Sequence, residues 1–103
     1  MKIAIGCDPN AENEKQALMK FIENKGLGKV TDFGSTDPIY ANVAIKVGEA
    51  VASKEYDRGI LLCGTGLGVS IAANKVKGAY AALLTDAYSA ERARLSNDAN
   101  IAC

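Results

Sequence analysis

The sequence predicts an α/β fold in which a parallel sheet of five strands is covered by helices on both faces. Short runs of β-branched and apolar residues alternate along the chain with longer segments whose apolar residues recur at helical spacing. Gly, Pro, Asn or Asp stands between these segments, and these residues favour turns and helix ends. Regular alternation of strands and helices is typical of a parallel sheet with right-handed crossover connections.

Five apolar runs are expected to form the strands. They are short and show little polar alternation, as do strands that are buried on both faces. In chain order they are Lys2–Cys7, Val30–Phe33, Ile60–Leu62, Ala79–Leu84 and Ile101–Cys103. The chain ends after only three residues of the last run, so we expect this strand to form an apolar edge without a covering helix.

Four longer segments are expected to form the helices. They cover residues 11–25, 39–54, 69–76 and 87–95. The alternation predicts a Rossmann-like three-layer αβα sandwich with the strand order 2-1-3-4-5. Ligands bind such sheets at the carboxyl ends of the strands, where the strand order reverses. Asp8, after the first strand, is therefore expected to face Cys63, after the third.

The candidate site lies in the stretch Gly59–Lys75, GILLCGTGLGVSIAANK. Cys63 follows the third strand, and Gly64, Gly66 and Gly68 form the turn into the next helix. Glycines allow a ligand to approach the backbone closely, and the amides before a helix favour an anion. We interpret Cys63 as a base or nucleophile beside a loop that stabilises an oxyanion.

A purely structural interpretation of this stretch remains open. Glycine-rich turns also make tight strand-to-helix connections, and a cysteine at a strand end is often a small buried hydrophobe. Two nucleotide-binding motifs are excluded. A P-loop requires Gly-Lys followed by Ser or Thr, but Lys75 follows Asn74. The G-x-G-x-G spacing in mid-chain also differs from the G-x-G-x-x-G dinucleotide fingerprint.

The composition of the chain argues against several classes of function. The 103 residues fit one domain, and twelve basic residues against twelve acidic ones give no electrostatic case for nucleic acid. No apolar segment is long enough to cross a membrane and the start does not resemble a signal peptide, so we expect a cytoplasmic protein. Cys7, Cys63 and Cys103 are expected to be free thiols. Without histidine, and with this cysteine spacing, we expect neither metal nor other cofactor.

The motif CGTGLGVSIAANK, together with IAIGCD, VTDFG, VGEAVAS and NDAN, resembles the family of ribose-5-phosphate isomerase B and galactose-6-phosphate isomerase. The resemblance covers essentially the whole chain and implies an aldose–ketose isomerase of a sugar phosphate. Family members need no metal and form dimers or tetramers, with sites built from two subunits. The resemblance also implies that the family's C-terminal helix would follow Cys103, so residues 1–103 form a single isomerase domain without that helix.

The resemblance assigns the chemistry to Cys63 and the loop that follows it. In the family, the matching cysteine moves a proton between C1 and C2 of the sugar. The loop backbone holds the enediolate, and the matching residues here are Gly64, Gly66, Leu67 and Gly68. This agrees with physical expectation, because removing a proton beside a carbonyl requires stabilisation of the charge that develops on oxygen.

The resemblance also implies that Asp8, Thr65 and Asn97 contact the sugar. Asp8 and Thr65 are candidates for moving a proton between the two sugar oxygens. Each has a structural alternative, since Asp8 is also suited to cap the first helix and Thr65 to bond within the turn. Ser70 and Asn74 are expected to brace the loop and helix rather than touch substrate.

The sequence departs from the family at positions that bind phosphate or open the sugar ring. Pro9 and Ser96 stand where the family has histidines, and the family's phosphate-binding arginines would follow Cys103. A tetrose phosphate, which forms no furanose ring, fits Ser96 best. The alternatives are one subunit of a heteromeric galactose-6-phosphate isomerase and a non-catalytic sugar-phosphate binding module.

The apolar residues of the expected third helix indicate that the chain associates with another subunit. Ile71, Ala72 and Ala73 form an apolar run with little polar interruption, which favours packing against another subunit. We expect a homodimer or tetramer, with a heteromer as the alternative. The cations available to bind phosphate are Lys75, Arg92 and Arg94.

Overall fold

The computed structural model describes residues 1–103 and confirms the three-layer αβα sandwich. Its five strands are all parallel. They are β1 (Lys2–Cys7), β2 (Lys29–Asp32), β3 (Arg58–Leu62), β4 (Ala81–Ala82) and β5 (Ile101–Ala102). The main difference from expectation is β4, which is only two residues long. Most of the apolar run that contains it forms irregular backbone.

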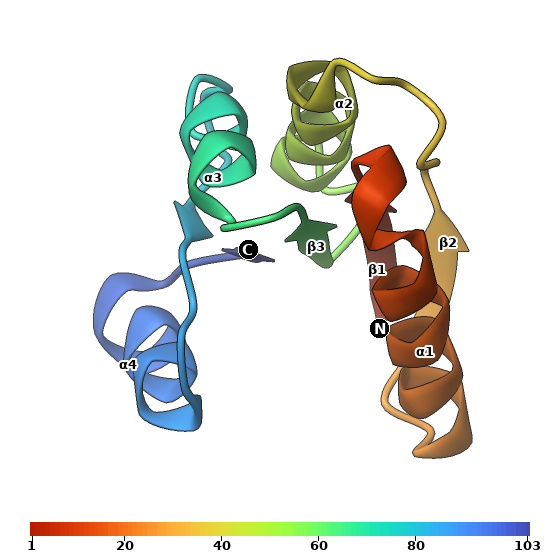
Figure 1. Ribbon diagram of the computed structural model, residues 1–103. Helices are drawn as coiled ribbons and strands as arrows, with labels where there is room; N and C mark the ends of the chain where they lie inside the picture. Colours follow the sequence, from red (N-terminus) through yellow and green to blue (C-terminus); the bar gives the residue numbers. More distant parts are fainter.

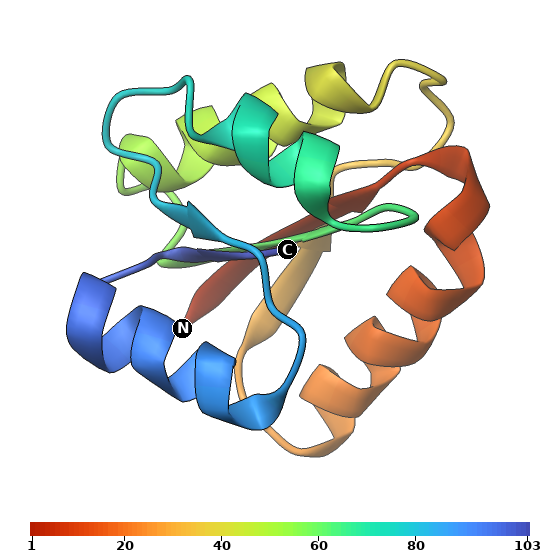
Figure 2. The ribbon, with the colours of Figure 1, turned by 60° about the vertical axis from the view of Figure 1, so that its left-hand side comes forward.

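The helices cover both faces of the sheet (Figures 1 and 2). They are α1 (Glu12–Asn24), α2 (Tyr40–Ala52), α3 (Leu67–Ala73) and α4 (Ala87–Asn97), and the 3₁₀ turn η1 (Pro9–Ala11) precedes α1. Figure 1 shows α2 and α3 on one face and α1 and α4 on the other. The helix α1 ends at Asn24, and Gly26, two residues further on, has a φ of 64°, the left-handed conformation common after a helix.

The predicted order of the last two strands was wrong. The observed order is β2-β1-β3-β5-β4, so β5 lies between β3 and β4. Ile101 pairs with Gly59 of β3 on one side and with Ala81 of β4 on the other. The physical reason is that α4 crosses the face opposite to α3. A right-handed connection over the opposite face must run in the opposite direction, back toward β3.

The main core lies between the sheet and the pair α2 and α3. Apart from Leu61, it is built from small and β-branched residues, which allow the helices to approach the sheet closely. Its members are Ala4, Ala44, Val47, Val51, Leu61, Val69, Ala73, Ala79 and Ile101. Because β5 is an internal strand, Ile101 contributes to the centre of this core although it stands near the end of the chain.

The opposite face of the sheet is less completely covered. A cavity of about 430 Å³ lies between α1 and α4, and apolar side chains such as Ile3, Phe21, Ile60 and Ala93 line it. This face therefore leaves apolar surface of the central strands accessible. Among the helices, none has both the length and the apolar character required to cross a membrane.

Replacement of Ile101 tests the internal position of β5. Ile101→Ala should lower the free energy of unfolding by about 2–5 kcal/mol, because it leaves a cavity in a packed core. Urea unfolding followed by circular dichroism measures the change. Leu95→Ala, on the exposed side of α4, is the control and should change the value by less than about 0.5 kcal/mol. Equal, small effects of both substitutions would contradict the burial of β5.

Candidate active site

The candidate site lies at the carboxyl edge of the sheet, where β1 and β3 end side by side. The backbone N–H of Asp8 donates a hydrogen bond to the carbonyl oxygen of Leu62 over 3.1 Å. Leu62 is followed directly by Cys63, so the predicted neighbourhood of Asp8 and the cysteine loop is observed. It follows from the parallel pairing of Cys7 with Leu62 at the ends of the two strands.

Cys63 is half-buried and is a free thiol. The backbone N–H of Gly66 donates to its Sγ over 3.0 Å. A donor aimed at sulfur stabilises the thiolate more than the neutral thiol. The loop therefore curls around the sulfur atom and aims one backbone donor at it.

The three glycines of the loop differ in how much room their surroundings leave for a side chain. Gly66 has a φ of 80°, and a Cβ there would lie 2.6 Å from Cδ1 of Leu83. A Cβ on Gly68 would lie 2.5 Å from the ring of Tyr40. A Cβ on Gly64 would meet no atom within 4 Å. Close packing thus accounts for Gly66 and Gly68, whereas Gly64 leaves open space above the loop.

Several loop amides are available to a ligand. The N–H groups of Gly64, Thr65 and Gly68 make no hydrogen bond within the chain. The N–H of Leu67, by contrast, donates to Oγ1 of Thr65 over 3.2 Å. The structural alternative for Thr65 is therefore observed, and the amide of Leu67 is occupied in this conformation. Since α3 has only seven residues, we attribute any anion stabilisation to the loop amides rather than to the helix dipole.

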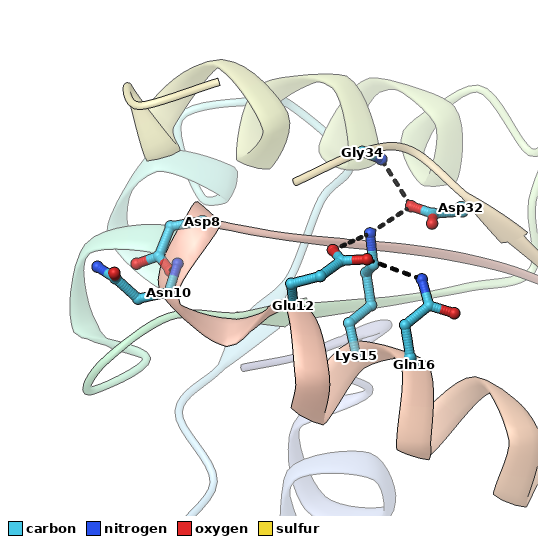
Figure 3. Close-up of polar contacts among 7 residues, drawn as sticks. All are labelled: Asp8, Asn10, Glu12, Lys15, Gln16, Asp32 and Gly34. Carbon is cyan, nitrogen blue, oxygen red and sulfur yellow. Dashed lines mark hydrogen bonds and ion pairs between the residues drawn. The ribbon is translucent and has the colours of Figure 1, made fainter. Parts of the chain in front are cut away.

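Asp8 caps the 3₁₀ turn η1 and not α1, whose N-cap residue Ala11 makes no side-chain hydrogen bond. Oδ1 of Asp8 accepts a hydrogen bond from the backbone N–H of Asn10 over 2.9 Å, at the start of η1. Figure 3 shows the Asp8 side chain beside Asn10, at the end of β1. Because a carboxylate accepts several hydrogen bonds, this cap leaves its second oxygen available to a ligand.

Asn97 is not brought to the cysteine loop within one chain. It is the last residue of α4, and the short connection that follows joins the amino edge of the sheet, where the N–H of Gly59 donates to the carbonyl oxygen of Asn100. In Figure 2, the end of α4 and the β3–α3 loop lie at opposite ends of the sheet. The β3 strand separates these two edges, so a role for Asn97 in the site requires a second subunit.

The expected bracing residues make contacts within the chain. Ser70 donates through Oγ to the carbonyl oxygen of Leu67 over 2.8 Å. Asn74 exchanges two hydrogen bonds of 2.9 Å with the backbone of Ala81, which ties α3 to β4. Both side chains therefore stabilise the fold around the loop.

The three expected cations differ in their availability. Arg94 forms an ion pair of 2.9 Å with Asp98, and Arg92 donates to Oγ of Ser96. Lys75 is exposed and forms no ion pair within the chain. The chain contains no cluster of three or more His, Cys, Asp and Glu side chains arranged to hold a metal ion.

A buried lysine near this edge of the sheet was not predicted from the sequence. Lys15 lies in α1, and only 1% of it is exposed. Ala11, Lys15, Leu18 and Ile22 follow the spacing of one helix face, so a lysine in an apolar stripe was the available signal. The position of Cys103 was also missed. Burial, together with the neighbouring Cys63, raises the pKa of the Cys103 thiol to about 12.

Comparison with known proteins identifies the family of this chain. The model of the ribose/galactose isomerase family matches residues 3–103. The chain belongs to this family. The ribose-5-phosphate isomerase B of Listeria innocua is 51% identical over an alignment of 104 positions that covers 98% of this chain and 70% of that protein. The D-erythrulose-4-phosphate isomerase 2 of Mycolicibacterium smegmatis is 46% identical over an alignment of 112 positions that covers 100% of this chain and 71% of that protein.

The fold is also that of solved members of the family. The ribose-5-phosphate isomerase B of Clostridium thermocellum superposes with a TM-score of 0.92 at 48% identity. The match covers 99% of this chain and 70% of that protein. These relatives are named as isomerases of different sugar phosphates, so family membership makes the chain a sugar-phosphate isomerase without fixing the sugar.

Substitution of two loop glycines tests whether Gly66 is closely packed and Gly64 faces open space. Gly66→Ala should lower the free energy of unfolding by about 1–3 kcal/mol, because it strains the left-handed backbone and crowds Leu83. Gly64→Ala is the matched control, and it should change stability by less than about 0.5 kcal/mol. Urea unfolding of the two variants measures the difference. Equal stability of the two variants would contradict the loop geometry.

Proposed function

We propose that this chain is a cytoplasmic aldose–ketose isomerase of a small sugar phosphate, working without metal through a cis-enediolate. The observation that carries the proposal is the arrangement of Cys63. Its Sγ accepts the N–H of Gly66, and the neighbouring amides of Gly64, Thr65 and Gly68 lack partners within the chain. A base beside unpaired donors suits proton abstraction next to a carbonyl.

The proposed reaction begins with the Cys63 thiolate. It takes the proton from C2 of the aldose, and the electron pair of that C–H bond forms the C1=C2 double bond. The carbonyl electrons move to the oxygen on C1, where the free loop amides stabilise the negative charge. The Cys63 thiol then returns the proton to C1, and a carbonyl forms at C2.

The hydroxyl proton must also move from the oxygen on C2 to that on C1. Asp8 and Thr65 are the proposed carriers, because both lie at the edge of the sheet that holds Cys63. Thr65 would need to release or share the N–H of Leu67, and Asp8 has an oxygen beyond its cap. The proton thus returns to the substrate, so the reaction consumes no co-reactant.

A tetrose phosphate is the substrate we propose. Ser96 replaces the ring-opening histidine expected from the family, and a tetrose phosphate presents no furanose ring to open. The Mycolicibacterium relative, named for erythrulose 4-phosphate, supports the same choice. Turnover of tetrose, pentose and hexose phosphates by the purified chain tests it, and exclusive turnover of a pentose or hexose phosphate would reject it.

One subunit of a heteromeric galactose-6-phosphate isomerase is the second candidate. A relative in Clostridium acetobutylicum is named as a subunit of that enzyme, which favours this possibility. In that case, the purified chain would turn over no sugar phosphate by itself and would gain activity with a second chain. A non-catalytic module would instead bind a sugar phosphate and stay inactive both by itself and with the second chain.

We propose a homodimer or tetramer as the working assembly. Ile39, Leu67 and Ile71 are apolar and exposed near the amino ends of α2 and α3, close to the cysteine loop. A second subunit on this surface would bury them and would offer a route for its own Asn97 into the site. It would also enclose the loop, where exclusion of water strengthens the electrostatic interactions.

Cys63→Ser tests the assignment of the base. The hydroxyl keeps the approximate size but is a far weaker acid than the thiol, so kcat should fall by about a thousandfold while substrate binding persists. Steady-state kinetics and equilibrium binding measure the two effects. Cys7→Ala is the control, because Cys7 is a buried side chain that the proposed chemistry does not use. Normal turnover by Cys63→Ser would remove Cys63 from the mechanism.

Ile71→Asp tests the proposed subunit contact. The side chain is 60% exposed in one chain, so an aspartate should leave the fold intact and disrupt only the assembly. Sedimentation velocity at micromolar concentration should show a dimer or tetramer for the original chain and a 10.8 kDa monomer for the variant. Leu95→Asp, on exposed α4, is the control. A monomeric original chain would refute the assembly.

A further inference from the structure

Lys15 occupies an unusual position for a charged side chain. It lies on the sheet-facing side of α1 with 1% of its surface exposed, and its stem passes through the interior. Figure 3 shows its ammonium between two carboxylates. Nζ lies 2.8 Å from Oδ1 of Asp32 and 2.9 Å from Oε2 of Glu12. The nearby chemistry proposed above makes no direct use of this lysine.

The ion pairs keep these groups charged. Burial lowers the pKa of Lys15, but hydrogen bonds to Asp32 and Glu12 outweigh this effect and leave its pKa above the ordinary value. Hydrogen bonding from Ser35, Lys15 and Gln16 lowers the pKa of Glu12 to about 2. Lys15 and Glu12 are therefore both ionised at neutral pH.

Stability by itself is a weak explanation for this cluster. The desolvation of a buried ion pair offsets much of its Coulombic attraction, and apolar replacements of such pairs are often neutral or stabilising. An ion pair does, however, impose a defined geometry on the groups that it joins. Lys15 is therefore expected to hold a particular part of the chain in place.

A series of hydrogen bonds leads from Lys15 to the end of β1. Oδ1 of Asp32, which accepts from Lys15, also accepts the backbone N–H of Gly34 over 2.8 Å. The carbonyl oxygen of Gly34 accepts the N–H of Cys7 over 3.1 Å. Cys7 directly precedes Asp8, whose N–H is bonded to the end of β3. The turn after β2 thus connects the lysine to the candidate site.

We propose that Lys15 is a positioning residue. By holding Asp32 and, through it, the turn at Gly34, it fixes the end of β1 and so the placement of the Asp8 carboxylate relative to Cys63. The inference rests on the proposed function, in which Asp8 contacts the sugar. Lys15 itself contacts no substrate. A buried ammonium suits this role because it reaches the same Asp32 oxygen that accepts the N–H of Gly34.

Lys15→Met is the first test, since it keeps the stem and removes the charge. Asp32 then loses its partner, turns toward solvent and releases Gly34. We expect kcat/KM to fall by about ten- to a hundredfold, which is typical of a misplacement of about 1 Å in a reactive geometry. Lys20→Met is the matched control on an exposed position of the same helix and should retain full activity.

The double variant Lys15→Met/Asp32→Asn shows whether Lys15 acts through Asp32. The amide that replaces the carboxylate needs no cation, and its oxygen still accepts from Gly34, so kcat/KM should recover at least tenfold relative to Lys15→Met. If the double variant is as impaired as Lys15→Met, the route through Asp32 is overturned.

The reactivity of the Cys7 thiol tests the positioning role of Lys15 without a measurement of enzyme activity. Cys7 is only 1% exposed, so release of Gly34 should accelerate alkylation of Cys7 by iodoacetamide at least tenfold in folded Lys15→Met. Peptide mass spectrometry follows each cysteine, and the rate at Cys103 should not change. If Lys15→Met does not fold, the double variant takes its place, and it should keep Cys7 protected.

The two readouts separate the possible failures. If the original chain turns over no sugar phosphate while Cys7 responds as expected, the proposed function fails but the network stands. If Lys15→Met matches Lys20→Met both in kcat/KM and in Cys7 alkylation, Lys15 has no positioning role. Reactive Cys7 in a folded double variant would also overturn the proposal.

Discussion

The parallel pairing of β1 with β3 is the interaction on which the candidate site depends. It sets Cys7 opposite Leu62, so the turn that carries Asp8 and the loop that carries Cys63 leave the sheet at the same edge. The bond from the N–H of Asp8 to Leu62 extends this ladder beyond the strands. A shift of one residue in register would separate these groups and turn the side chains of the shifted strand to the opposite face of the sheet.

The cysteine loop combines close packing with unpaired backbone donors. Gly66 and Gly68 have no room for side chains because Leu83 and Tyr40 lie against them. This packing fixes the loop so that the Gly66 amide meets the sulfur of Cys63. The amides of Gly64, Thr65 and Gly68 remain without partners within the chain, so they are available to solvent or to a ligand.

Within one chain, the candidate site residues are divided between the two edges of the sheet. Cys63, Asp8 and the Lys15 cluster gather near the carboxyl ends of β1 and β3, whereas Asn97 lies at the amino edge. A site that needs both groups is therefore incomplete in a single subunit. The exposed apolar residues of α2 and α3, beside the cysteine loop, are consistent with a site that is completed by association.

The sequence by itself determined the α/β class, nearly all the elements and the central loop, because local signals specify them: apolar runs, helical periodicity and Gly at the turns. The prediction that Asp8 would lie beside the Cys63 loop was also confirmed, since adjacent parallel strands end at the same edge. Only the tertiary structure decided the order of β4 and β5. That order depends on which face α4 covers, and α4 buries no residue that would mark a preferred face in the sequence. The burial of Lys15 between Glu12 and Asp32 was likewise a tertiary result, because the partner that holds it comes from a strand 17 residues away in the chain.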